Sequence, residues 1–472
     1  MLEKLKGRSR SESAAIVATG AAFFMIVLDT SIVNLALPRI KYVFHADLTA
    51  LQWLVDGYAL VFASLLLNAG ALGDRYGAKR VFSAGLIIFC TASAVCGLAP
   101  GMASLQCARA VQGIGAAILL PNSLAALNHT VQDPGRKKIA VSAWSSAGAL
   151  GVAVGPLVGG LLVQYLDWRS IFLVNIPVGL AGFWLARQHV AVGPRHTQRE
   201  FDPIGQLLAV VTLAGLTYWM ISLGRSHGFS ASIILLGGGV IGLGAAFLWV
   251  ESRQANPVLP LDLLFRPGLG SVALVGLLHN VGIYGLIFAL SLVFQELRGM
   301  SPVGAGLLFL PLTLTLVAGT RAGAKFLRKS DPFGPQIWGH AISAFGAIAL
   351  AVTGFSHSFI TIAIPLCVIG VGAGSTVPSM NLSALDSVEL ERSGLSSGIL
   401  NSARQTGGVI GVALLGTLVG GSATAAGARW ASAAAAIALA GASVLAARIA
   451  RQHKTSVTSG VHLMEPTHDE PH

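Results

Sequence analysis

The chain alternates between long runs of apolar residues and short segments that hold most of its charge, proline and glycine. A helix needs about 20 mostly apolar residues to cross the hydrocarbon of a bilayer, and lipid does not tolerate irregular backbone. Each run therefore predicts one membrane-spanning helix, and dividing the chain at its polar breaks gives fourteen spans. Their approximate limits are 14–36, 50–72, 80–99, 104–126, 138–162, 169–189, 205–223, 231–250, 269–294, 303–325, 336–355, 359–381, 397–419 and 427–449.

The composition strengthens this prediction. The chain has 472 residues, of which 54% are hydrophobic and 11% are charged. A soluble protein usually has about a quarter of its residues charged, so this chain has too little charge to cover a surface in water. We therefore predict an all-α membrane protein. Its basic N-terminal start resembles that of a signal peptide, but Asp29 interrupts the first apolar run, so we expect an uncleaved first helix.

The basic residues are unevenly distributed among the predicted loops. With both termini in the cytoplasm, the inner segments carry 23 Lys and Arg residues and the outer loops carry six. Because cytoplasmic loops hold the excess of basic residues, this distribution predicts that both termini are cytoplasmic. Contact with the lipid bilayer and its anionic head groups also accounts for the net charge of +11, so we expect no nucleic-acid partner.

Two longer polar segments divide the spans into groups. Six spans precede the segment 187–203, two follow it, and six more follow the segment 251–267. This layout predicts two six-helix bundles and two additional helices. The predicted parts are an N-terminal segment (1–13), a first bundle (14–189), a linker with two extra helices (190–268), a second bundle (269–449) and a cytoplasmic tail (450–472). We expect the polar tail from about residue 451 to be mobile.

A loop rich in glycine and charge follows the second predicted span. Gly73 and Gly77 allow a tight turn and a close approach of helices, and Asp74 can accept hydrogen bonds from the N-terminus of a neighbouring helix. A weaker copy at 318–325 lacks the acidic residue. The alternative interpretation is an ordinary basic turn. The candidate conformational latch comprises Gly70, Gly73, Asp74, Arg75, Gly77, Lys79 and Arg80.

Three ionisable residues lie inside predicted spans at a similar depth. Asp29, Asp56 and Arg109 are about five to seven residues from the outer ends of their spans, which is a difference of a few ångströms at ~1.5 Å per residue. Two carboxylates near one arginine should titrate as a coupled set, so we predict a proton-coupling site. Alternatively, Asp29 contacts Thr30 or Asn34, Asp56 caps its helix, and Arg109 anchors the bundle. Which acid would exchange the proton stays open.

The fifth predicted span carries a glycine motif. Gly151, Gly155 and Gly159 recur every four residues and form a flat ridge on which another helix can lie, and Pro156 bends the span. Gly160 completes the motif.

Further polar residues within the spans are candidates for the lining of a substrate cavity. They are Asn34, Gln112, Trp144, His279, Arg404 and Gln405. The four cysteines lie in apolar runs without metal-ligand spacing, and the chain contains no G-x-x-x-x-G-K-[ST] string. We therefore expect no metal, no cofactor and no use of ATP, and we do not expect an enzyme.

Taken in order, these strings resemble motifs of the major facilitator superfamily, in particular of its branch of 14-span drug:proton antiporters. The strings are Leu28–Pro38, Gly70–Arg80, Arg109–Gly115, Gly151–Gly160 and Asn401–Gly408. The resemblance implies a major facilitator fold in a bacterial cytoplasmic membrane and export of amphipathic or cationic toxic compounds in exchange for protons. It also implies that Asp74 and Arg75 latch the bundles against a helix that begins near Ser396 and Ser397.

Two alternatives remain at this point. A facilitator or importer of a metabolite could use the same fold, and it would show flux independent of pH. A polytopic sensor or membrane-embedded enzyme would need an extramembrane domain or a catalytic cluster. Every predicted loop is too short for such a domain, and the sequence has no nucleophile-and-base arrangement. We expect a monomer with a small-molecule substrate.

Overall fold

The computed structural model describes residues 2–193, 202–225, 230–254, 257, 259, 261–264, 268–327, 333–353, 358–388, 393–420 and 423–462. All regular structure within these residues is helical. The helices are α1 (Leu2–Phe44), α2 (Leu48–Tyr76), α3 (Ala78–Gly97), α4 (Met102–Thr130), α5 (Pro134–Tyr165), α6 (Ser170–Leu173), α7 (Asn175–His189), α8 (Pro203–Arg225), α9 (Ala231–Glu251), α10 (Leu261–Leu264), α11 (Leu269–Leu292), the π-helix η1 (Val293–Leu297), α12 (Pro302–Leu327), α13 (Gly334–Thr353), α14 (Phe359–Asp386), α15 (Ser393–Val419) and α16 (Ala425–His462).

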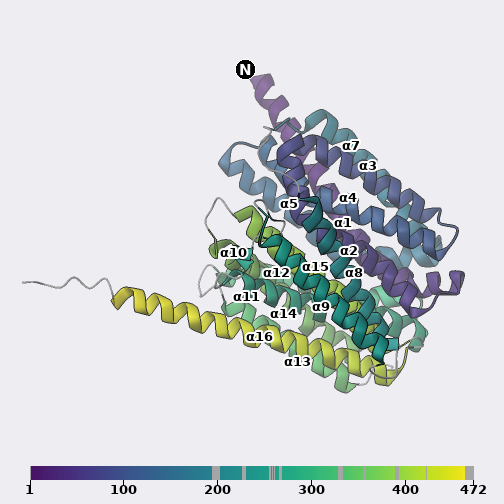
Figure 1. Ribbon diagram of the computed structural model, residues 1–472. Helices are drawn as coiled ribbons and strands as arrows, with labels where there is room; N and C mark the ends of the chain where they lie inside the picture. Colours follow the sequence, from purple (N-terminus) through teal and green to yellow (C-terminus); the bar gives the residue numbers. More distant parts are fainter. Residues whose placement is uncertain are drawn as a thin grey trace, which may run out of the picture.

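The long helices form two bundles with the same internal contacts (Figure 1). In the first bundle, α1 packs on α5 and α7, α2 packs on α4, and α3 packs on α4 and α7. In the second, α11 packs on α15 and α16, α12 packs on α14, and α13 packs on α14 and α16. Helices at equivalent places along the two halves thus have equivalent neighbours. The weak repeat in the sequence corresponds to a structural repeat, as is common in transporter folds.

Thirteen helical segments of the described chain are long and apolar enough to cross a membrane. The 27-residue α15 is a fourteenth long helix, and its first half carries Asn401, Arg404 and Gln405. Many large apolar side chains point outward on these helices, for example Leu235 and Ile241 on α9, which are 75% and 74% exposed. Such faces are suited to lipid rather than water. The predictions of an all-α, multi-pass membrane protein and of fourteen long helices are confirmed.

Two helices extend well beyond the predicted spans. α1 begins at Leu2, and α16 continues to His462 and projects away from the bundles in Figure 1. The predicted tail is therefore helical from residue 450 to His462. Adding residues to an existing helix is much easier than nucleating one, so the alanine-rich first part of α16 can carry a polar extension. The rest of the tail, 463–472, lies outside the described residues.

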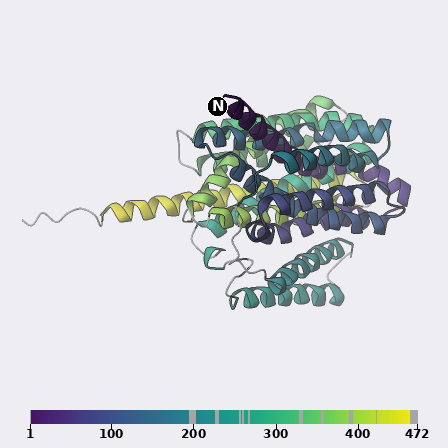
Figure 2. The ribbon, with the colours of Figure 1, turned by 90° about the horizontal axis from the view of Figure 1, so that it is seen from above.

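The two additional helices α8 and α9 pack on each other at the edge of the bundles, as Figure 2 shows. α8 contacts α2 of the first bundle and α15 of the second. Its Gln206 donates a hydrogen bond to the carbonyl oxygen of Ser64 at 2.7 Å and accepts one from Asn68 at 2.6 Å. The extra pair is thereby tied to the first bundle through polar contacts on α2.

The bundles meet mainly through two helix pairs, α2 with α15 and α5 with α12. The start of α1 and the end of α16 lie at one end of the bundles, which we call the terminal end (Figures 1 and 2). Several contacts between the bundles lie toward the opposite end. Lys41 of α1 forms an ion pair with Glu296 of η1 at 2.9 Å, and Gln52 of α2 donates to the carbonyl oxygen of Ala413 on α15 at 3.0 Å. These contacts hold the bundles together at the opposite end.

Candidate functional site

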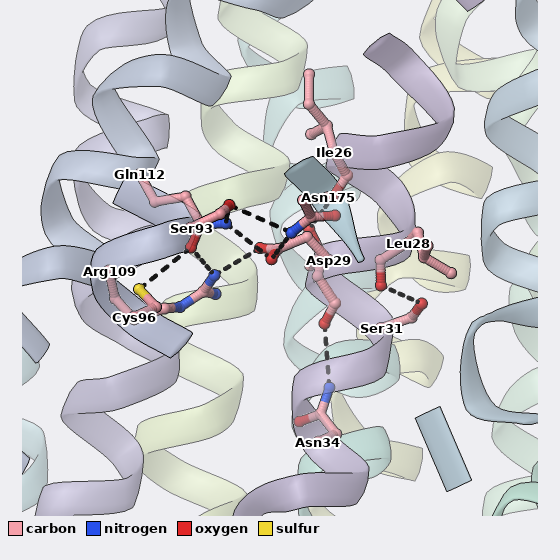
Figure 3. Close-up of polar contacts among 11 residues, drawn as sticks. Ile26, Leu28, Asp29, Ser31, Asn34, Ser93, Cys96, Arg109, Gln112 and Asn175 are labelled. Carbon is pink, nitrogen blue, oxygen red and sulfur yellow. Dashed lines mark hydrogen bonds and ion pairs between the residues drawn. The ribbon is translucent and has the colours of Figure 1, made fainter. Parts of the chain in front are cut away.

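A buried ion pair joins α1 to α4 inside the first bundle. Arg109 donates from Nη1 to Oδ2 of Asp29 at 2.5 Å, and the two side chains are 1% and 0% exposed. The other carboxylate oxygen of Asp29 accepts hydrogen bonds from Gln112 at 2.9 Å and from Asn175 at 3.0 Å. Figure 3 shows the carboxylate of Asp29 facing these three side chains. The charge of Asp29 is thus compensated by one cation and two amide donors.

The charge of Arg109 is compensated in turn. Its Nη1 also donates to Oε1 of Gln112 at 2.7 Å. Its guanidinium lies over the ring of Tyr58, 4.1 Å from the centroid, and 5.8 Å from the centroid of Phe172. Gln112 donates to Ser93 at 2.7 Å, which fixes the orientation of its amide. An arginine buried among apolar helices needs such partners, because a lone charge there costs several kcal/mol.

Three members of this network were not among the candidates from sequence. Ser93, Tyr58 and Asn175 are single polar or aromatic residues within apolar spans, and each lies on a different helix. Asn175 is the first residue of an Asn-Ile-Pro string, which was the one available signal for it. The alternative contacts of Asp29 are not what the structure has: Thr30 bonds to a backbone carbonyl of its own helix, and Asn34 does the same.

Asp56 has a different environment from Asp29. It is fully buried within α2, and neither of its carboxyl oxygens has a hydrogen-bond partner among the described residues. It does not cap the helix, because Asp47 occupies that position and accepts from the amide of Ala50 at 2.8 Å. Asp56 faces a cavity between the two bundles. The cavity is lined by Thr30, Val33, Asn34, Val55, Asp56, Tyr58, Ala59, Arg109, Tyr284, Gln405, Gly408 and Val412.

The structure therefore brings the three predicted ionisable residues to one region without pairing all of them. Asp29 and Arg109 form the ion pair, and Arg109 and Asp56 line the same cavity. Of the residues predicted to line a cavity, Asn34 and Gln405 do so. Gln112 instead lies within the Asp29 network.

Trp144 is placed away from this cavity. Its ring stacks on Phe23 with 4.2 Å between the centroids, and its Nε1 donates to Ser123 at 3.1 Å. It thus fills the space between α5, α1 and α4 within the first bundle.

His279 lies in the interior of the second bundle. Its Nδ1 is 3.1 Å from Nε2 of His340, and Nδ1 of His340 is 2.6 Å from the carbonyl oxygen of Gln336. A carbonyl oxygen only accepts, so Nδ1 of His340 carries a proton and donates it. When His340 is neutral, its Nε2 then accepts from Nδ1 of His279. The pair forms an ordered chain of hydrogen bonds between α11 and α13, apart from the residues that line the cavity.

Arg404 on α15 directly precedes Gln405, which lines the cavity, and its environment is unlike that of Arg109. Its buried Nε has no hydrogen-bond partner, and no carboxylate of the described residues forms an ion pair with it. The stem of the side chain packs on Gly276 of α11, where an added Cβ would lie 3.0 Å from Cγ of Arg404. Gly408 and Val412, four and eight residues further along α15, line the cavity on the same face of the helix.

The glycine motif of α5 supports two close helix contacts. A Cβ at Gly151 would lie 2.9 Å from the carbonyl oxygen of Phe24, and one at Gly159 would lie 2.7 Å from the side chain of Ile32, both on α1. Gly160 faces α12, where a Cβ would lie 2.5 Å from the carbonyl oxygen of Pro302. The predicted flat ridge is therefore present, and it serves both the first bundle and the contact between bundles.

The predicted latch lies at the end of α2. Gly77 has φ of +94°, a conformation that favours glycine, and its amide donates to the carbonyl oxygen of Gly73 at 2.9 Å. The side chain of Asn122 on α4 occupies the position that a Cβ of Gly73 would need. Lys79 donates to the carbonyl oxygen of Arg187 at 2.9 Å. The predicted tight turn and close helix approach are therefore present.

The neighbour expected for the latch also lies alongside. α2 packs against α15, where Ser402 donates to the carbonyl oxygen of Ala63 at 3.2 Å. α15 begins at Ser393, three residues before the expected start near Ser396. Asp74 is in the last turn of α2.

Comparison with known proteins agrees with this architecture. The Major Facilitator Superfamily profile matches residues 19–412. The chain is 36% identical over 411 residues to a protein of Mycobacterium tuberculosis named drug efflux pump JefA, with 86% of this chain and 80% of that protein covered. It is also 36% identical to the methylenomycin A resistance protein of Streptomyces coelicolor, with 86% and 85% covered.

Solved structures share the fold at low sequence identity. A bacterial homologue of the human lysosomal transporter Spinster, in an inward-facing and unoccupied conformation, has a TM-score of 0.65 at 16% identity. The alignment covers 93% of this chain and 97% of that protein. A transporter of the POT family in complex with 5-aminolevulinic acid has a TM-score of 0.67 at 13% identity, with 92% and 96% covered. With a family match over most of the chain, the two repeated bundles and the cavity between them, this chain belongs to the Major Facilitator Superfamily.

Proposed function

We propose that this chain exports drugs, antibiotics or similar toxic small molecules and takes up protons in exchange. The observation that carries the proposal is the carboxyl group of Asp56, which is buried without a partner in the cavity between the bundles. A buried carboxylate without compensation is costly, whereas a neutral carboxylic acid is tolerated far better. Asp56 can therefore hold a proton while its surroundings are dry and release it when water or a substrate enters.

Asp29 is a weaker candidate for the exchanging acid. Its oxygens accept from Arg109, Gln112 and Asn175, and a proton on Asp29 would weaken these contacts. We assign to this pair the role of holding α1, α4 and α7 in register beside the cavity. Arg109 of this pair and its neighbour Tyr58 line the same cavity as Asp56.

Protons supply the energy in this proposal. A proton that enters down a potential of about 100 mV releases roughly 2.3 kcal/mol, before any pH gradient is counted. That energy is sufficient for modest accumulation of a substrate against its gradient.

Alternating access would arise from rocking of the two bundles. The contacts at the opposite end, including Lys41 with Glu296, belong to a conformation that is closed there. Opening that end would separate Gly160 from α12 and bring the latch around Asp74 against the first turn of α15. We place the terminal end in the cytoplasm of a bacterial cell and the bundles in its cytoplasmic membrane, because the basic residues concentrate in the segments at that end.

Several relatives support export as the direction of transport. Those that match over most of this chain are named as a drug efflux pump, a methylenomycin A resistance protein and a cephamycin export protein. We propose the same direction here, with one chain as the working unit. A metabolite facilitator on the same fold would move its substrate without dependence on pH.

The test is efflux of a panel of dyes and antibiotics from cells that express the chain. Wild-type cells should lose the dye faster than control cells, and a protonophore should abolish the difference. Asp56→Asn should abolish proton-driven efflux, while an exposed control, Arg429→Gln at the start of α16, should keep it. Efflux by Asp56→Asn with unchanged rate and pH dependence would contradict the assignment of Asp56.

A further inference from the structure

Two ionisable side chains of opposite sign, one from each bundle, lie near the cavity without an ion-pair partner among the described residues. Asp56 is fully buried and lines the cavity, whereas Arg404 is partly buried and precedes Gln405, which lines it. Asp56 belongs to α2 of the first bundle, and Arg404 belongs to α15 of the second. Within the described chain they do not form an ion pair with each other or with any other side chain. The other charged residue that lines the cavity is Arg109, which is paired with Asp29.

The surroundings of Arg404 contain few acids. The helices that pack most closely on α15 are α2, α8, α11, α14 and α16. Their acidic residues are Asp56 and Asp74 on α2 and Asp386 on α14. Asp74 is in the last turn of α2 and Asp386 is the last residue of α14, so Asp56 is the one acid among these that lies in the interior of its helix. The nearest titratable neighbours of Arg404 on α11 are His279 and Tyr284, and His279 is hydrogen-bonded to His340 of α13.

The relative height of Asp56 and Arg404 follows from contacts between α2 and α15. Gln52 donates to the carbonyl oxygens of Val412 and Ala413, and Ser402 donates to that of Ala63. The two helices are therefore antiparallel, and Asp56, one turn from Gln52, is level with residue 408. Arg404 is one further turn toward the terminal end, an axial offset of about 6 Å from Asp56.

Once Asp56 is ionised, it and Arg404 are two opposite charges offset by about one helical turn along the helix axes, with a cavity beside Asp56. Such an arrangement matches a ligand that has two opposite charges. We infer that the substrate is amphoteric: it carries a cationic group that binds Asp56 and an anionic group, such as a carboxylate or an acidic enol, that binds Arg404. A guanidinium recognises a carboxylate with two parallel hydrogen bonds. This inference rests on the proposed function and narrows its substrate class from toxic small molecules in general to compounds that carry both charges.

The arrangement is compatible with exchange for a proton. A proton on Asp56 removes the partner of the cationic group, so proton and substrate compete for this carboxyl. Arg404 keeps its charge throughout and holds the other end of the substrate. Selectivity for amphoteric substrates would therefore depend on Arg404, and proton coupling would depend on Asp56. The two properties can be separated by mutation.

The test uses three related dyes with the full-length chain in proteoliposomes and an imposed pH gradient. The dyes are a rhodamine with a free carboxyl group, the methyl ester of the same rhodamine and fluorescein, which are amphoteric, cationic and anionic, respectively. We expect wild type to transport the amphoteric dye at least about tenfold more efficiently than its ester, because the ester lacks the charge-assisted bonds to Arg404. Arg404→Gln should lower transport of the amphoteric dye to the level of the ester and leave the ester unchanged.

Two further variants separate binding from folding. Arg404→Lys keeps the charge and should retain part of the preference for the amphoteric dye, whereas exposed Arg429→Gln should retain all of it. Equal transport of the amphoteric dye and its ester by wild type, or an equal loss of both in Arg404→Gln, would overturn the inference and leave the proposed function intact. If none of the three dyes moves in response to the pH gradient, the proposed function fails and the inference fails with it.

Discussion

Each bundle has an arginine well inside one of its long helices, Arg109 in α4 and Arg404 in α15, and the surroundings of the two residues differ greatly. Arg109 in the first bundle has a carboxylate, an amide oxygen and two aromatic rings around its guanidinium. Arg404 in the second bundle packs its stem on Gly276 and has no ion pair within the described chain. Two arginines inside long helices thus form a completed ion pair in one case and leave an available charge in the other.

The difference shows how to distinguish a structural charge from a functional one in a membrane protein. A buried charge with partners stabilises the fold through its contacts with them. Removing it leaves the partner charge buried and uncompensated, which destabilises the protein. A buried charge without partners costs stability, so we explain its presence by the binding of a substrate or a proton. The same comparison applies to Asp29 and Asp56 on the acidic side.

The largest expected effect is loss of stability on removal of Arg109. Arg109→Gln leaves the carboxylate of Asp29 buried without its cation and should cost about 3–5 kcal/mol. Arg404→Gln removes a charge that has no partner and should leave the stability equal or slightly higher. Apparent melting temperatures of the purified variants in detergent measure both effects.

A double variant provides the control for this prediction. Asp29→Asn with Arg109→Gln removes both charges and should recover much of the stability lost by Arg109→Gln alone. A double variant as unstable as the single one would show that Arg109 acts through packing on Tyr58 and Phe172 rather than through its charge.

The comparison of the two acids gives the second prediction. Asp56→Asn replaces a neutral buried acid by an amide of similar shape and should change stability by less than about 1 kcal/mol, while it removes proton-driven transport. Asp29→Asn should lower stability and reduce transport without removing its dependence on pH. Melting temperature and the pH profile of efflux, measured on the same two variants, separate these effects. A reversed pattern would assign proton exchange to Asp29.

The third prediction concerns the surface where the bundles meet. Gly160→Leu should force α5 away from the backbone of α12 near Pro302 and cost about 1–3 kcal/mol in the conformation closed at the opposite end. Gly242→Leu on α9 is the matched control, because no heavy atom lies within 4 Å of the position of its Cβ. Labelling of cysteines introduced at the opposite end should increase in Gly160→Leu. Equal labelling in both variants would exclude this contact as a closure.

The smallest effect should come from the ion pair between the bundles at their opposite end. Lys41 and Glu296 have side chains that are 27% and 20% exposed, so Lys41→Ala should cost about 1 kcal/mol or less. A charge swap, Lys41→Glu with Glu296→Lys, should restore the wild-type labelling of the opposite end. If labelling in Lys41→Ala equals that of wild type, or if the swap does not restore it, the ion pair does not contribute to closure.

Much of the architecture followed from one-dimensional patterns. The apolar runs predicted the long helices, and the polar breaks predicted two groups of six with two between them. The ends of helices were harder to predict, as the extension of α16 to His462 shows, because a helix can continue into polar residues once it has formed. The turn at Gly77 and the flat face of Gly151 and Gly159 were predictable because only the local backbone and the lack of a side chain decide them.

The sequence by itself determined that this chain is a bundle of membrane-spanning helices with charged residues at a common depth. It could do so because the bilayer imposes a fixed length and an apolar surface on every segment that crosses it. The tertiary structure alone decided which of those charges are paired. Partnership depends on the rotation of each helix about its axis and on neighbours far away in sequence, so Ser93 and Asn175 complete the site of Asp29 while Asp56 and Arg404 remain without ion pairs in the described chain.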